Sequence, residues 1–143
     1  MERARVGEIV SLVEEASQAF GFWVMHSSSL YSPKVRQSRD ASKTAEDRLH
    51  KTLNIIEDYC QENVVERGLW SAGTEGVTLA DICLASLVEY ARDFYGRDLC
   101  ASGEHEVLKV WVGKWEGTEA GKRGGGKTPP EEFARLAREN VWE

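Results

Sequence analysis

The sequence predicts an all-α fold, a bundle of five helices around one core. Apolar residues recur at spacings of three and four along most of the chain, and no segment alternates with a period of two. Clear helix-start signals stand at Thr78 and Thr128. The length of 143 residues suits one compact domain, and a hydrophobic share of 41% is enough for a single core.

The first two helices are expected over residues 2–25 and 35–61, separated by a serine-rich break that contains Pro33. Each has an apolar stripe on one face. In the first helix the stripe is Val6, Ile9, Val10, Val13, Ala16 and Phe20. In the second it is Leu49, Leu53, Ile56 and Cys60, and the first half of that helix is polar.

The third helix has the clearest start, at Thr78. Thr78 is a good N-cap, and Asp81 stands three residues later, where its carboxylate completes a capping box. Val77 and Ile82 occupy the positions of a hydrophobic staple. Gly96 is the expected C-cap. Because apolar residues cover most sides of this helix, we expect it to be the buried centre of the core.

The rest of the chain is expected to form a fourth helix over residues 103–115, a glycine-rich linker and a short last helix. The linker, residues 121–128, matches the phosphate-binding pattern G-x-x-x-x-G-K-[ST]. That chemistry needs a strand before the loop, and two prolines follow it directly, so we do not expect nucleotide binding. The expected division is a helical domain over 1–120, the linker over 121–128, and a helix and tail over 129–143, with Thr128 as N-cap.

Composition argues against several classes of function. Lys plus Arg number 18 against 24 Asp plus Glu, a net charge of −6, so direct nucleic-acid binding is not expected. Neither a membrane span nor a secretory leader is recognisable, and we expect a cytoplasmic protein without membrane contact. The three cysteines and three histidines lack ligand spacing, so we expect reduced thiols and no metal site. Four of these residues have expected environments: His50 and His105 at the surface, Cys83 buried and inert, and Cys100 a surface thiol.

The stretch Thr78-Leu-Ala-Asp81-Ile-Cys-Leu-Ala resembles the signature of the buried helix in the C-terminal, all-helical domain of glutathione transferases. In that family the hydroxyl residue and the Asp form the capping box of the helix. Residues 53–59 and 105–115 also resemble the helices that precede and follow the signature. The resemblance spans residues 2 to about 120 and implies the same helical bundle.

One part of that family is missing from the sequence. The thioredoxin-like domain of glutathione transferases binds glutathione and supplies the catalytic Tyr, Ser or Cys. Its βαβ pattern and its cis-proline turn are not seen, and the prolines are confined to positions 33, 129 and 130. We therefore expect that no cofactor is required. Glutathione is a possible ligand, but the domain that usually binds it is not seen in this sequence.

By position, the resemblance implies a pocket for an apolar ligand, built from the end of the first helix, the central helix and the tail. The implied ligand-binding residues are Phe22, Trp23, His26, Tyr90, Phe94 and Trp142. His26 and Tyr90 are weak candidates for catalysis, because an imidazole and a phenol can orient a ligand or move a proton. Aromatic residues at helical spacing are also typical of a core, and a His at a helix end is typical of a C-cap. Both interpretations stay open.

Two functions are therefore expected. The first is binding of a hydrophobic small molecule, as a glutathione-independent isomerase or cyclase or as the substrate-binding half of a glutathione transferase. The second is a non-catalytic protein-interaction module, like those of translation elongation factor 1 gamma or aminoacyl-tRNA synthetase complexes. The apolar surface that a thioredoxin-like domain would cover needs another cover, so we expect a homodimer or a heteromer.

Overall fold

The computed structural model describes residues 2–30, 33, 36–124 and 128–143, and it is all-α, as predicted. Within these residues there are six α-helices and no strand. In chain order they are α1 (Glu2–Ser27), α2 (Arg39–Cys60), α3 (Leu79–Glu89), α4 (Glu106–Glu116), α5 (Glu119–Arg123) and α6 (Glu131–Arg138). Wider π-helical turns continue two of them, η2 (Gln61–Glu66) after α2 and η3 (Tyr90–Phe94) after α3. None of the described helices combines the length and apolar character that crossing a bilayer requires.

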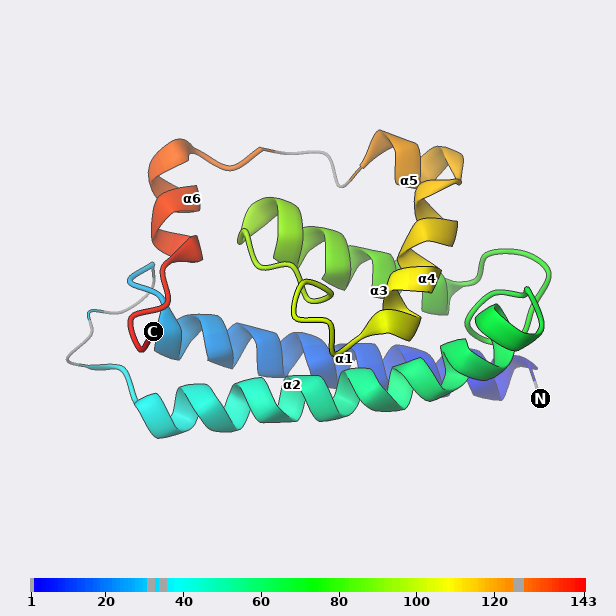
Figure 1. Ribbon diagram of the computed structural model, residues 1–143, viewed down its shortest axis with the longest axis horizontal. Helices are drawn as coiled ribbons and strands as arrows, with labels where there is room; N and C mark the ends of the chain where they lie inside the picture. Colours follow the sequence, from blue (N-terminus) through cyan, green and yellow to red (C-terminus); the bar gives the residue numbers. More distant parts are fainter. Residues whose placement is uncertain (1, 31–32, 34–35, 125–127) are drawn as a thin grey trace.

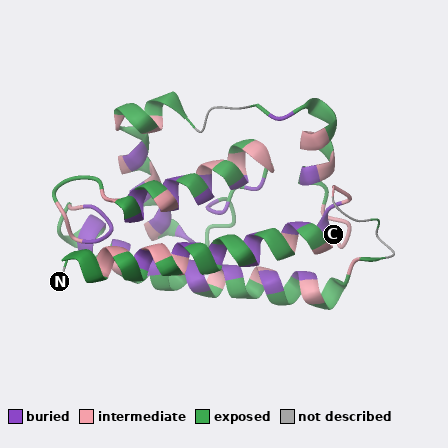
Figure 2. Cartoon of the chain, turned by 180° about the vertical axis from the view of Figure 1, so that it is seen from behind, coloured by how far each residue is buried: buried purple, intermediate pink, exposed green. Residues whose placement is uncertain are grey.

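The two long helices, α1 and α2, run antiparallel and side by side, and α3 and α4 pack above them (Figure 1). Buried and exposed residues alternate along both long helices, as expected for amphipathic helices with one buried face (Figure 2). The predicted stripe of α2 is confirmed, because Leu49, Leu53, Ile56 and Cys60 are all fully buried. Four of the six stripe residues of α1 are buried, and Val6 and Val10 pack partly buried against the core.

The start of α2 differs from the prediction. The helix begins at Arg39, and its N-cap is Ser38, whose Oγ accepts the Ala41 backbone N–H at 3.1 Å. A serine at this position offers the first turn a side-chain acceptor and so fixes where the helix starts. Residue 35, the expected first residue, lies outside the described residues.

The capping box of α3 is confirmed. The Thr78 backbone N–H donates to Asp81 Oδ2 at 3.0 Å. The other oxygen, Oδ1, accepts the Ser71 backbone N–H (3.1 Å), the Ser71 hydroxyl (2.7 Å) and Trp111 Nε1–H (3.0 Å). Asp81 is fully buried. One carboxylate therefore caps α3 and also fastens it to the preceding loop and to α4.

The outer face of α3 is exposed, which corrects the prediction of a helix buried on most sides. Val77 and Ile82, the expected staple pair, are 41% and 49% exposed, and Leu79 is 58% exposed. The opposite face carries the burial, through Ala80, Leu84, Ala85, Leu87 and Val88. Periodicity indicates which residues share a face of the helix, but it does not say whether another element covers that face. Within the described residues no element covers the outer face of α3.

The segment after α4 also differs from the prediction. Part of the expected linker region forms α5, whose N-cap Thr118 accepts the Gly121 N–H on its hydroxyl oxygen at 3.0 Å. A Cβ on Gly121 would lie 2.0 Å from the Trp115 carbonyl oxygen, so only glycine fits this close turn. Helix α6 has Pro130 as its N-cap, so the assignment of Thr128 was wrong. Residues 125–127 of the phosphate-binding pattern lie outside the described residues.

Candidate functional site

An open groove of about 840 Å³ lies between α1 and α3. One wall comes from α1, between Val13 and Gly21, and the other from α3 and the η3 turn, between Cys83 and Tyr95. A second hollow of about 320 Å³ shares Phe20, Gly21 and Tyr95 with it and extends toward Met25, near the end of α1. The two hollows lie next to each other along α1, and we call them together the α1–α3 groove.

Small side chains keep the α1–α3 groove open. Ser17 and Gly21 lie one turn apart on α1, and Ser86 stands opposite on α3. Each serine hydroxyl bonds back to the carbonyl four residues earlier in its own helix, at 2.8 Å for Ser17 and 3.0 Å for Ser86. Their polar groups are thereby satisfied locally, and the space between the helices is left free for a ligand.

Aromatic rings form one end of the groove. Tyr90 stacks on Phe94, with ring centroids 4.7 Å apart and planes 6° from parallel. Tyr95 contacts Tyr90 and Phe20 edge to face, at 5.3 and 5.4 Å. Phe133 of α6 meets Phe94 at 4.6 Å, so the last helix supports this aromatic wall from behind. The wall follows the π-helical turn η3, and such turns are frequent at functional sites.

The structure brings only some of the expected ligand-binding residues to this groove. Tyr90 lines the larger hollow and Phe22 the smaller one. Phe94 stacks behind Tyr90. Trp23 lines neither hollow, because its ring lies under the Arg97 guanidinium, 4.4 Å from the ring centroid.

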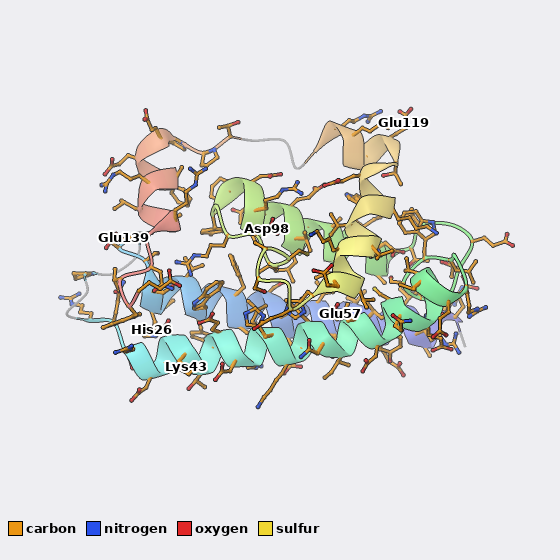
Figure 3. The ribbon with its side chains drawn as sticks, in the orientation of Figure 1. His26, Lys43, Glu57, Asp98, Glu119 and Glu139 are labelled. Carbon is orange, nitrogen blue, oxygen red and sulfur yellow. The ribbon has the colours of Figure 1, made fainter. Side chains whose placement is uncertain are left out.

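The two other expected residues, His26 and Trp142, meet at the far end of α1 and do not line the groove. Trp142 Nε1–H donates to the His26 carbonyl oxygen at 2.5 Å. His26 Nδ1 accepts the Ser38 backbone N–H at 3.2 Å, so its ring joins the end of α1 to the start of α2. Figure 3 shows His26 at this end of the molecule, together with Lys43 of α2 and Glu139 of the tail. His26 and Trp142 therefore do not line the α1–α3 groove, and His26 does not join Tyr90 there; the implied role of these residues in ligand binding stays a prediction.

The cause of this tail position is Arg97, a residue that the sequence analysis missed. Its guanidinium is buried and donates to Ser27 Oγ (2.8 Å) and to the carbonyl oxygens of Ala137 (3.3 Å) and Glu139 (3.1 Å). Burial lowers its pKa to about 10, so it stays charged at neutral pH. The only signal in the sequence was the position of Arg97 directly after Gly96, the expected C-cap. The structure bears out the turn there, because Gly96 has a φ of +66°.

Cys83 and Cys100 reverse their expected environments, whereas Cys60 is buried in the α2 stripe as predicted. Cys100 is buried, and burial raises its pKa to about 11. Cys60 is fully buried, and burial raises its pKa to about 12. Cys83 is partly exposed and lines the α1–α3 groove. The groove therefore contains the accessible thiol of the chain, which offers a chemical probe of its occupancy.

The expected surface position of His105 is wrong as well. Its side chain is 1% exposed and its Nδ1 lies 2.6 Å from Glu57 Oε1. His50 is 24% exposed and contacts His105. These residues lie on α2 and just before α4, and none of them lines the α1–α3 groove.

Comparison of the chain with protein-family models, with curated proteins and with solved structures finds no match.

Proposed function

We propose that this protein binds an apolar small molecule in the α1–α3 groove. The observation that carries the proposal is the groove itself, about 840 Å³ in volume and lined mainly by apolar and aromatic side chains. Ligand pockets in proteins typically measure about 300–1,000 Å³ and combine apolar walls with a few polar groups. The resemblance of residues 78–85 to glutathione transferases supports the same interpretation, because the corresponding helices of that family supply its hydrophobic substrate pocket.

The polar groups of the groove favour a neutral or cationic ligand. Glu14 is the one charged side chain among the described lining residues, and Ser17, Gln18 and Ser86 add neutral polar groups. A carboxylate beside the binding site disfavours an anion, so glutathione, an anion at neutral pH, is a poor fit. A flat apolar ring could stack on the exposed side of Tyr90, which is 52% exposed. Binding in this groove requires no cofactor.

Catalysis, if it accompanies binding, would fall to Tyr90. Among the described lining residues, the titratable groups are Glu14, Cys83, Tyr90 and Tyr95. A tyrosine hydroxyl can orient a carbonyl or transfer a proton, as an isomerase or a transferase would require. Substitution of Tyr90 by Phe keeps the ring and removes the hydroxyl, which separates stacking from proton transfer.

The groove can be tested with a neutral fluorescent probe and with Cys83. N-phenyl-1-naphthylamine should bind saturably, with a rise in fluorescence, and should slow the alkylation of Cys83 by iodoacetamide. Ser86→Trp fills the groove and should abolish both effects. Val110→Trp adds the same ring at a 51% exposed position of α4 outside the groove and should change neither. Probe binding that survives in Ser86→Trp would exclude this groove as the site.

A second candidate is the docking of a protein partner, favoured by the exposed apolar face of α3. Leu79 and Ile82 are 58% and 49% exposed, and neither lines the groove. A patch of this kind is typical of an interaction surface. Light scattering at increasing concentration measures self-association directly. Ile82→Glu should reduce such association and leave binding of the naphthylamine probe intact, so the two candidates are distinguishable.

A further inference from the structure

A chain of polar side chains connects the buried side of α2 with the surface, on the side of α2 that faces α4. His105 Nδ1 lies 2.6 Å from Glu57 Oε1, and His105 Nε2 lies 2.8 Å from His50 Nδ1. His50 Nδ1 in turn lies 3.5 Å from Glu104 Oε2. Figure 3 shows Glu57 on α2, close to where the chain enters α4. None of the residues described as lining the α1–α3 groove belongs to this cluster.

Glu57 has two structural tasks in this cluster. Its Oε2 accepts the Leu108 backbone N–H at 3.0 Å, so it caps the first turn of α4 from outside that helix. Its Oε1 faces His105 Nδ1, which must carry the proton because a carboxylate accepts. This bond fixes the tautomer of His105 and leaves the lone pair of Nε2 directed at His50. A buried carboxylate that orients a histidine in this way is the usual outer support of a metal-binding histidine.

The loop and the helix both contribute donors at suitable positions. Gly103, with φ at +78°, turns the chain just before Glu104 and His105. His50 lies on α2 four residues after Glu46, whose Oε1 is 4.0 Å from His50 Nε2. When His50 binds a metal ion through Nδ1, its Nε2–H therefore faces the Glu46 carboxylate, just as the Nδ1–H of His105 faces Glu57.

We propose that His50, His105 and Glu104 form a binding site for a divalent transition metal of the Zn²⁺ class. One donor atom from each residue lies within 4.8 Å of the other two. Zinc binds imidazole nitrogen at about 2.0–2.1 Å in tetrahedral geometry, which places two nitrogens about 3.3 Å apart. The present 2.8 Å separation of the two imidazole nitrogens needs to widen by only about half an ångström. Three protein donors leave the fourth position for water or for a ligand.

The donor set also predicts selectivity. Imidazole nitrogens suit zinc, cobalt, nickel and copper, whereas calcium and magnesium require oxygen donors. The site offers two imidazoles and one carboxylate, and the 63% exposed Glu104 side chain can move onto the ion. Zn²⁺ should therefore bind with a stoichiometry of one, and Ca²⁺ should not bind.

Isothermal titration of the tag-free, chelator-treated protein with ZnCl₂ tests the site. One equivalent should bind with micromolar or tighter affinity, and Co²⁺ should give the intense visible absorption of a four-coordinate site. His50→Gln should abolish binding, and Glu104→Gln should weaken it. Glu57→Gln, which disturbs the orientation of His105 and the bond to the Leu108 N–H, should weaken binding by about 10–100-fold.

His26→Gln is the matched control, because it removes the one histidine outside the cluster. Zinc binding should be unchanged in this variant. The proposal is overturned when the wild-type protein binds no zinc, or when His50→Gln binds it as tightly as the wild type. Circular dichroism of each variant establishes that it is folded, and the exposed Glu104 supplies a test that leaves the core intact.

Discussion

The buried carboxylate of Asp81 should be among the largest single contributions to the stability of this fold. Asp81→Ala removes the carboxylate half of the α3 capping box, which costs about 1 kcal/mol. It also leaves two fixed buried donors, the Ser71 N–H and the Trp111 indole N–H, without their acceptor. Each such donor costs about 1–3 kcal/mol. Water entering the space left by the carboxylate recovers part of this, so we expect a loss of about 4 kcal/mol.

Denaturation by urea, followed by circular dichroism, measures this loss in the free energy of unfolding. Two further variants divide it into parts. Trp111→Phe removes one donor and keeps the carboxylate, so it should cost less than Asp81→Ala. Asp58→Ala removes an exposed carboxylate from α2 and should lie within about 0.5 kcal/mol of the wild type. A loss in Asp81→Ala no larger than that of Asp58→Ala would refute the role assigned to the buried carboxylate.

Three further predictions concern the tail, a thiol and two glycines. Arg97→Met should release α6 from the bundle, because it removes the bond to the Ala137 carbonyl oxygen. Amide hydrogen exchange should then become fast in α6 while the α1–α2 core stays protected. Arg92→Met, which removes a surface ion pair with Asp93, should leave exchange in α6 unchanged. Stability should fall from about pH 9 toward pH 12, and Cys60 should contribute about 1.4 kcal/mol per pH unit to this fall, because burial raises the pKa of Cys60 to about 12 while the unfolded thiol ionises near 8.5. Cys60→Ala should reduce this slope and leave the part due to Cys100, whose pKa burial raises to about 11, and an unchanged slope would contradict the role of Cys60. Gly113→Ala adds a Cβ where there is open space, so it should stabilise the fold by about 0.5–1 kcal/mol and raise the melting temperature. Gly121→Ala should lower the melting temperature, because its Cβ would clash with the Trp115 backbone carbonyl.

Local signals in the sequence predicted the local structure well. The stripe of α2 and the capping box at Thr78 are both confirmed, because each depends on spacings of three or four residues within one helix. The exposure of Ile82 could not be predicted in this way. Periodicity places it on an apolar face, and only the packing of the whole chain decides whether that face is covered.

The candidate sites depended on long-range contacts, and sequence reasoning located them only in part. Tyr90 and Phe22 were expected beside a pocket and do line the groove. The pairing of Glu57 with His105 joins residues separated by 48 positions, and neither residue is unusual in its local sequence. The spacing of Glu46, His50 and Glu57 on one face of α2 was the available hint, and its meaning depends on the loop that packs against it.

The closure of α1 by the tail has a consequence for the order of folding. The bond between Trp142 and the His26 carbonyl spans 116 residues. At a synthesis rate of about 5–20 residues per second, roughly 6–23 s separate the emergence of its two partners from the ribosome. During this interval α1 and α2 can already pair, whereas Arg97 has no carbonyl oxygens of α6 to bind. The end of α1 is therefore the last part of the bundle to be sealed during biosynthesis.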